Sequence, residues 1–214
     1  MTPRQPVSRA AHKTESPVGR TTAGSTVAAY ATLAARCDTR LADGSLDTAG
    51  SLASQLFRMS ETRPTPEQIR QRVREQGWDV VSVPAQAGIP PHSYTVGLAR
   101  RGLHEFIVFG FSPELARPVL GDLAQRARDG ERFPTNVGLE DVLPGMPAVL
   151  LDVPSVEADH YLAAARDCVP TNFRALQIVW PDERDLFPWQ DGYDEVFRGR
   201  QIVLQPFART GASR

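Results

Sequence analysis

Lysine is almost missing from this chain of 214 residues, in which it occurs once, at Lys13. A domain without lysine cannot form a Schiff base, so pyridoxal-phosphate and lysine-aldolase chemistry are excluded for the rest of the chain. A phosphate-binding P-loop needs its lysine and is excluded with them. The 24 basic and 25 acidic residues nearly balance. This balance favours neither a nucleic acid nor a membrane surface as a partner.

Cysteine and long apolar runs are scarce too. The two cysteines, Cys37 and Cys168, lie far apart, which argues against a disulfide framework and against a thiolate zinc site. No apolar run approaches the roughly 20 residues that a bilayer span needs. The N-terminus lacks the apolar core of a secretory signal. These absences predict a cytoplasmic protein without a membrane partner.

Motifs of common cofactor and hydrolase sites are absent as well. The glycines form no G-x-G-x-x-G after a strand, so the dinucleotide fingerprint is missing. There is no G-x-S-x-G nucleophile elbow either. The sequence therefore assigns no cofactor, although flavin or haem binding that uses no such motif stays open.

Composition divides the chain into four parts. Residues 1–26 are polar and poor in large apolar groups, which predicts a disordered leader. Residues 27–62 carry apolar side chains at helical spacing, which predicts a helical arm that could join two copies into a homodimer. A single domain is expected over residues 63–208, followed by a disordered tail over 209–214.

Helix signals in the main domain are clear at three places. Thr65, Pro66 and Gln68 form a capping box with proline at the first helical position. A second helix should run from residue 113 to about Gly130, with a kink or a later start caused by Pro118. A third should begin at Ser155.

Strand signals alternate with these helices in an order that favours hairpins. The run over residues 105–111 is almost continuously apolar, as in a central strand buried on both faces. The pattern predicts an α+β domain with a mostly antiparallel sheet and helices packed on one face. The expected strands cover residues 78–83, 92–98, 105–111, 147–153, 174–180 and 200–204.

An ordered set of segments resembles a known family. The segments are GWDVVSV at 77–83, YTVGL at 94–98, HEFIVFGF at 104–111 and LQIVWPDERDLFPW at 176–189. Together they look like the bacterial family called domain of unknown function 4262, over about residues 64–207. The chain differs by its long leader and by Phe106 and Phe111, where leucine is commoner. The resemblance implies a shared fold and assigns no reaction.

The first candidate site is the segment from Tyr94 to Leu98. In a strand, Tyr94 faces one way while Thr95 and Gly97 face the other. A glycine inside a strand indicates a bulge or a close approach by a ligand or a helix. The segment is either a core strand with a bulge or a strand whose Thr95 and Gly97 line the floor of a pocket. Tyr94 is also a candidate ligand-binding residue.

The second candidate site is the proline-broken stretch that holds Trp180 and Trp189. One interpretation is a turn in which Asp182 bonds its own following backbone. The other is an aromatic-walled pocket with Asp182, Gln177 and Arg184 as its polar groups. A carboxyl group beside indole rings would have a raised pKa, which suits a general acid or base. The same pocket would also bind a cationic or planar ligand.

The histidines offer a third possibility. His92 and His104 lie near the ends of the expected strand pair, with Glu105 beside His104. Two histidines and a carboxylate can bind a metal, but no metal-binding spacing is present, so no metal is assigned. Either imidazole could instead act as a lone base near Tyr94.

Two functions remain open on these residues. The first is a domain that binds a small molecule or peptide in the aromatic-walled cleft. The alternative is a small-molecule enzyme, acid–base or hydrolytic, that uses Asp182 with His92 or His104. The enzyme hypothesis requires these groups to lie within reach of one another in a concave site.

Overall fold

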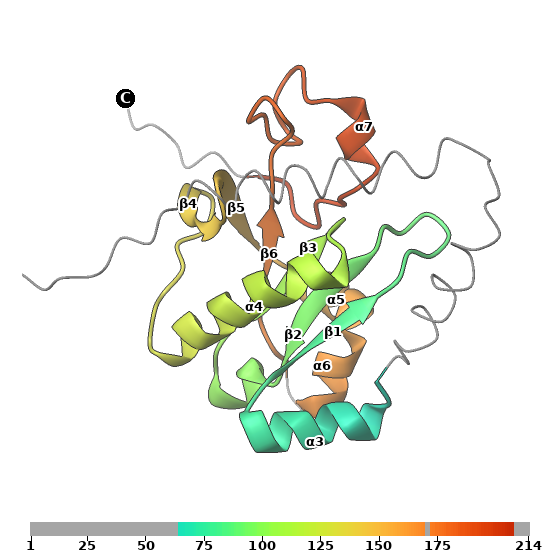
Figure 1. The fold of residues 1–214 in the computed structure, drawn as a ribbon, viewed down its shortest axis with the longest axis vertical. Helices are drawn as coiled ribbons and strands as arrows, with labels where there is room; N and C mark the ends of the chain where they lie inside the picture. The colour runs from blue at the N-terminus through green and yellow to red at the C-terminus, as the bar shows by residue number, and fades with distance from the viewer. Residues whose placement is uncertain (1–63, 170–171, 208–214) are drawn as a thin grey trace, which may run out of the picture.

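The structure is a computed structural model that describes residues 64–169 and 172–207 (Figure 1). The predictions for the leader over 1–26, the arm over 27–62 with its self-association, and the tail over 209–214 fall outside the described residues. The described parts form one sheet with helices packed against it.

Helix α3 (Pro66–Gln76) begins at the predicted capping box. The N–H of Gln68 donates to Thr65 Oγ1 at 3.2 Å, and the N–H of Thr65 donates to Gln68 Oε1 at 2.8 Å. Each side chain thus satisfies a backbone donor that the first turn leaves without a partner. The helix ends at Gly77, whose φ of 87° is a left-handed conformation that glycine adopts readily.

A six-stranded sheet forms the centre of the fold, in the order β1-β2-β3-β6-β5-β4. Every neighbouring pair is antiparallel except β3 and β6, which run parallel. The α+β class and the mostly antiparallel sheet are therefore confirmed. The strands are β1 (Asp79–Val83), β2 (His92–Val96), β3 (Glu105–Phe109), β4 (Gly138–Leu143), β5 (Met146–Asp152) and β6 (Ala175–Val179).

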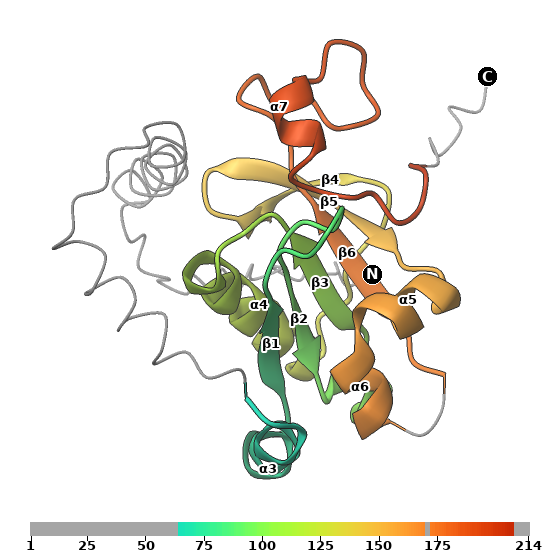
Figure 2. The same cartoon turned by 90° about the vertical axis from the view of Figure 1, so that its right-hand side faces the viewer.

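Helices cover both faces of this sheet, which corrects the prediction of a single helical layer. Helix α4 (Pro113–Arg128) packs on the face that carries Phe106. Helices α5 (Ser155–Tyr161) and α6 (Ala163–Cys168) cover the opposite face, which carries Ile107. Figure 2 shows α4 on one side of the sheet and α5 with α6 on the other. Because the central strand is apolar on both faces, both faces need a cover.

Two predicted helices differ in detail from the observed ones. Helix α4 begins at Pro113 and includes Pro118, so the proline does not move the start. The helix expected from Ser155 is divided at Leu162, whose φ of −109° and ψ of 47° are not helical. Leu162 is fully buried, so this break turns its side chain into the core.

Three short or exposed elements were not predicted by the pattern. Strand β4 is a largely exposed edge strand, so it carries no apolar signal. Helix α7 (Glu195–Arg198) is a single turn capped by Asp194. A short 3-10 helix, η1 (Leu98–Arg101), follows β2. Residues 200–204 form no strand, in contrast to the prediction, because they bond to side chains rather than to a neighbouring strand.

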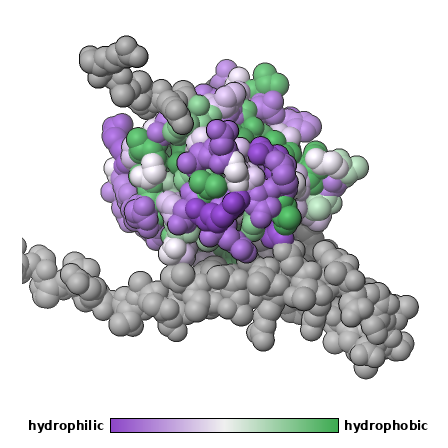
Figure 3. Space-filling model, turned by 90° about the horizontal axis from the view of Figure 1, so that it is seen from above, coloured by the Kyte–Doolittle hydropathy of each residue, from purple (hydrophilic) through white to green (hydrophobic). Residues whose placement is uncertain are grey.

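The surface at the α7 end of the molecule is mixed. Figure 3 views this end and shows hydrophobic residues scattered among hydrophilic ones. The large hydrophobic side chains exposed in the described parts of the chain are Val137, Val156 and Val196. Within residues 64–169 and 172–207, no helix combines the length and the apolar character that crossing a bilayer requires.

Candidate functional site

The segment from Tyr94 to Leu98 surrounds a buried carboxylate. Thr95 Oγ1 donates to Glu105 Oε2 at 2.6 Å. The N–H groups of Gly97 and Ala99 donate to Glu105 Oε1 at 2.8 and 3.0 Å. Thr95 and Glu105 are fully buried, so these groups form the core at the end of β2 and do not line an open pocket floor. Burial raises the pKa of Glu105, and hydrogen bonds from Ala99, Thr95 and Gly97 oppose that rise.

Gly97 is close to helix α3, as the alternative of a helix approach anticipated. Its φ is 109°, and a Cβ atom there would lie 2.8 Å from Val73 Cγ1 and 3.0 Å from the carbonyl oxygen of Gly77. Only glycine combines this conformation with this spacing. The glycine in YTVGL is therefore explained by packing.

His92 and Tyr94 lie in the core on the α5 and α6 side. The His92 ring is 5.1 Å from the Phe109 ring and 5.7 Å from the Tyr161 ring, between centroids. The hydroxyl of Tyr94 accepts from the N–H of Ala164 at 3.3 Å. Tyr94 also lines a cavity of about 330 Å³ between α3 and α6.

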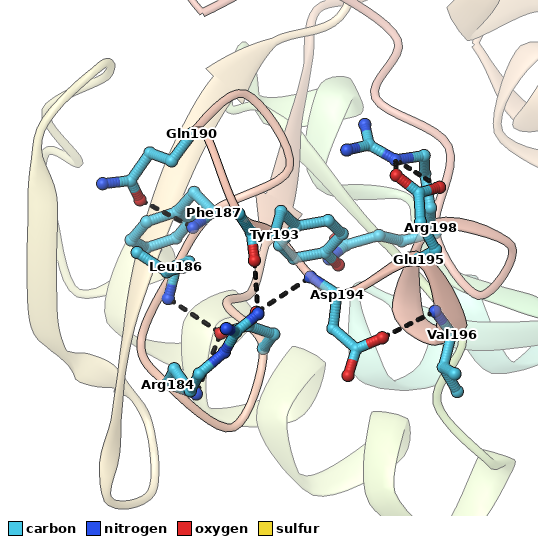
Figure 4. Close-up of polar contacts among 12 residues, drawn as sticks. Arg184, Leu186, Phe187, Gln190, Tyr193, Asp194, Glu195, Val196 and Arg198 are labelled. Carbon is cyan, nitrogen blue, oxygen red and sulfur yellow. Dashed lines mark hydrogen bonds and ion pairs between the residues drawn. The ribbon is translucent and has the colours of Figure 1, made fainter.

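Asp182 organises the loop between β6 and α7; Figure 4 labels Arg184, Leu186 and Asp194, which bond to it. Its Oδ1 accepts from the N–H groups of Arg184 at 2.9 Å and Leu186 at 3.0 Å. Its Oδ2 accepts from the N–H of Asp194 at 3.0 Å and lies 3.4 Å from the Arg184 guanidinium. The turn interpretation of Asp182 therefore describes the observed geometry.

These bonds keep Asp182 ionised. Burial alone would raise the pKa of its carboxyl, but the N–H donors of Leu186, Asp194 and Arg184 outweigh burial and lower it. A general acid at neutral pH needs the opposite shift. The hydrogen bonds and ion pairs of Asp182 all stay within its own loop.

The two histidines are placed apart. His92 lies opposite Phe109, at the end of β3, whereas His104 precedes the first residue of that strand. The strand separates them by about 16 Å. Burial and then Arg174 lower the pKa of His104. Catalysis by Asp182 with His92 or His104 thus stays a prediction, and no shared constellation supports it.

The described part of the chain also lacks a cluster for a metal ion. No three His, Cys, Asp or Glu side chains within residues 64–169 and 172–207 are grouped as metal ligands would be. His92 and His104 cannot share an ion across the length of β3, and the Glu105 carboxylate is occupied by hydrogen-bond donors.

The two tryptophans belong to different clusters. The Trp180 indole N–H donates to the carbonyl of Phe109 at 2.9 Å, and its ring packs against Phe111 and Phe197. Trp189 stacks on Phe187 and on Phe207, with centroids 5.1 and 4.4 Å away. Neither indole lines the cavity beside Tyr94 or the cleft described next. The expected cleft between two indole walls is therefore replaced by two separate packing clusters.

The Gln177 side chain anchors the C-terminal segment to β6. Its side-chain amide donates to the carbonyl of Ile202 and accepts from the N–H of Leu204 at 2.9 Å. Gln201 bonds the backbone of Trp180 in the same way, through the Trp180 carbonyl at 2.6 Å and the Trp180 N–H at 3.3 Å. Gln177 is fully buried, so its side chain is not exposed to a ligand and its bonds hold the C-terminal segment in place.

A large open cleft lies along β1, at the edge of the sheet. Its volume is about 1100 Å³. Helix α3 forms one wall, the start of α4 forms another, and α3 and β1 diverge from the turn that joins them (Figure 1). We call it the edge cleft. It is lined by Pro64, Thr65, Gln68, Gln71, Arg72, Glu75, Val80, Ser82, Val83, Pro84, Ala85, Pro91, His92, Ser93, Phe111, Ser112, Pro113 and Arg117.

The backbone of β1 points alternate groups into this cleft. The N–H of Gly110 donates to the carbonyl of Pro91 at 2.7 Å, which fixes the phase of the β2–β3 pairing. His92, Tyr94 and Val96 therefore bond towards β1, to Val83, Val81 and Asp79. The N–H and C=O groups of Val80 and Ser82 consequently point away from the sheet.

Two arginines from opposite sides of the sheet meet at the start of β1. Arg72 Nε of α3 lies 3.2 Å from Asp79 Oδ2, and Arg117 of α4 lies 3.8 Å from Asp79 Oδ1. Arg117 also donates to the carbonyl of Val80 at 3.4 Å. The Asp79 carboxylate is buried, whereas both arginines remain partly exposed in the cleft.

Of the predicted site residues, only His92 lines the edge cleft. The residues that the sequence did not single out include Ser82 and Ser93, whose hydroxyl groups bond at 2.8 Å on neighbouring strands. Arg72 and Arg117 were missed as well. The heptapeptide GWDVVSV contains the signal for a strand, but whether that strand is central or at an edge depends on distant segments.

Comparisons with known proteins place the chain in a family without extending its function. A search of curated proteins and a search of solved structures each found no match. The model of one family matches residues 72–194, which contain all six strands. The chain therefore belongs to the family described as domain of unknown function (DUF4262), as its motifs had indicated.

Proposed function

We propose that this domain binds an extended polypeptide segment, which adds as a strand to β1, the edge strand of the sheet within the described residues. The observation that carries the proposal is the phase of the sheet. Val80 and Ser82 direct backbone groups into a cleft that is walled by α3 and α4. Strand addition to such an edge is a recurrent mode of peptide recognition.

The size and walls of the edge cleft support a peptide. Enclosed sites for small molecules usually measure about 300–1,000 Å³. The edge cleft reaches about 1100 Å³ and is open along a strand. The outward groups of Val80 and Ser82 are one N–H and one C=O each, of which the Val80 carbonyl already accepts from Arg117. The remaining three groups can each add about 0.5–1.5 kcal/mol in hydrogen bonds to a peptide backbone.

A proline substitution at Ser82 tests this mode directly. The Ser82 N–H makes no bond to β2, so Ser82→Pro removes an outward donor and edge strands tolerate proline there. Ser82→Ala is the matched control, because it loses the same hydroxyl bond to Ser93 but keeps the backbone N–H. Circular dichroism and thermal unfolding check that both variants fold.

The probe is a synthetic library of N-acetylated hexapeptides, selected by affinity and identified by mass spectrometry. We expect the wild type and Ser82→Ala to retain the same peptides and Ser82→Pro to bind them about two- to twelvefold more weakly, because it lacks one bond of about 0.5–1.5 kcal/mol. Hydrogen exchange at the Ser82 amide should slow when a selected peptide is bound. Equal binding by the folded Ser82→Pro variant would refute strand addition and leave the cleft to a small molecule.

A further inference from the structure

We propose that the edge cleft recognises the C-terminal carboxylate of the added peptide, through Arg72 and Arg117. This inference rests on the proposed strand addition and names the chemistry of the ligand. It starts from the direction in which a peptide would lie along β1.

The direction of the bound peptide follows from the way in which it pairs with β1. Antiparallel pairing is somewhat more stable per residue than parallel pairing. A peptide that pairs antiparallel with β1 runs from the Val83 end towards the Asp79 end, so its last residue lies at the start of β1. Arg72 and Arg117 converge at that same point, on Asp79.

Both guanidinium groups have N–H donors that make no bond within the described residues. Arg72 approaches Asp79 through Nε only, and within the described residues its terminal nitrogens make no hydrogen bond or ion pair. Arg117 uses NH1 towards Asp79 and NH2 towards the carbonyl of Val80. The Asp79 Oδ2 atom is itself buried without a well-formed hydrogen bond, so Arg72 contacts this carboxylate as an ion pair and not through an aligned hydrogen bond. Guanidinium forks match carboxylate oxygens in charge and in geometry.

One acidic residue of the cleft opposes this attraction. Glu75 lies on the next turn of α3 from Arg72, and its carboxylate accepts from Gln71 Nε2 at 2.9 Å. Glu75 is exposed, so solvent screens its charge more than that of the buried Asp79. Neutralising Glu75 should therefore strengthen the binding of a carboxylate.

The experiment uses the full-length chain and the hexapeptide library in two forms, with a free C-terminal carboxylate and with a C-terminal amide. We expect the wild type to prefer the acid form about tenfold, with a preference that weakens as salt is added. Arg72→Gln and Arg117→Gln should each lose this preference. Glu75→Gln should increase it.

Arg74→Gln is the matched control on the same helix. Arg74 pairs with Glu67 and does not line the cleft, so its loss should leave the acid preference unchanged. Because Arg72 and Arg117 also hold Asp79, each variant needs a test of folding. Binding of amide peptides, which requires only the edge of β1, provides that test, and Arg72→Lys keeps the charge if Arg72→Gln fails to fold.

The outcomes separate the two proposals. Equal binding of acid and amide peptides, with binding still weakened in Ser82→Pro, would overturn carboxylate recognition and leave strand addition standing. Enrichment of Asp or Glu at the last position of the amide peptides, without an acid preference, would assign the arginines to a side chain and overturn the terminal assignment. Binding that ignores Ser82 in both forms would overturn the proposed function itself.

Discussion

Replacing Glu105 with glutamine should make the stability of the fold less dependent on pH. The carboxylate is fully buried and accepts three hydrogen bonds, from Thr95, Gly97 and Ala99. In Glu105→Gln the amide oxygen can keep both backbone N–H bonds, and the amide nitrogen can donate to Thr95 Oγ1. The substitution therefore removes the charge and keeps both backbone hydrogen bonds. The bond with Thr95 is reversed, so the Thr95 hydroxyl, which already accepts from the N–H of Phe106, loses its acceptor; this cost does not depend on pH.

The sign of the pH effect follows from the raised pKa of Glu105. Its ordinary value is 4.5, and burial raises it in the folded state despite the hydrogen bonds. Between these two values the folded state binds more protons than the unfolded state. The free energy of unfolding of the wild type therefore falls as pH rises through this window, by at most about 1.4 kcal/mol per pH unit. The free energy of unfolding of Glu105→Gln has no such slope. Its stability relative to the wild type should therefore increase as pH rises through this window and stay constant above it.

Urea unfolding followed by tryptophan fluorescence, between about pH 4.5 and pH 8, measures both proteins. Glu105→Ala is the contrasting variant, because it leaves the N–H groups of Gly97 and Ala99 without an acceptor. Each buried donor without a partner costs about 1–3 kcal/mol, so this variant should lose about 2–6 kcal/mol near pH 4.5, and the loss should shrink as pH rises because only the wild type has the slope. A wild type that gains stability over Glu105→Gln as pH rises would refute the reasoning.

Four further substitutions test other parts of the fold. In Asp182→Asn the amide nitrogen would replace one acceptor oxygen and face a backbone N–H donor. The free energy of unfolding, measured by thermal denaturation, should therefore fall by about 1–3 kcal/mol. Lost turnover with unchanged stability would favour catalysis instead. Since the pKa of Asp182 is lowered, its stabilising effect should persist above the ordinary value of 3.8 and disappear as pH falls through the folded pKa. Gly97→Ala should lower the free energy of unfolding by about 2–4 kcal/mol, because Gly97 has a positive φ and close neighbours. Gly102→Ala should lower it by only about 1 kcal/mol, because Gly102 has a positive φ but open space around it. Equal losses in urea would contradict the packing argument. Gln177→Leu should raise the rate of hydrogen exchange at the Leu204 amide about tenfold, because that N–H loses its acceptor. An unchanged rate would show that this hydrogen bond is not needed to hold the C-terminal segment.

Local signals predicted much of the first half of the fold. The capping box at Thr65 and Gln68 needs only residues three apart, and the structure has both of its bonds. The apolar run of β3 depends on burial on both faces, and β3 is fully buried. Both signals are contained in a short stretch of chain, which is why the sequence alone reveals them.

The candidate site was less accessible to sequence reasoning, because its features are not local. The clustering of Trp180 and Trp189 in the sequence suggested one pocket, but the chain turns between them and sends the rings into separate clusters. The edge cleft depends on which strands lack a neighbour. That order is decided by the pairing of β3 with β6, between residues such as Glu105 and Ala175.

The single parallel pair also has a consequence for how the chain assembles. Strands β1, β2 and β3 follow one another through short connections, and β4 and β5 form a hairpin. The seam between β3 and β6 instead joins residues 70 positions apart, as in Glu105 and Ala175. Closing so long a loop is entropically costly, and contacts between distant residues slow folding. The meander and the hairpin should consequently form early, and the seam that unites them should be the slow step.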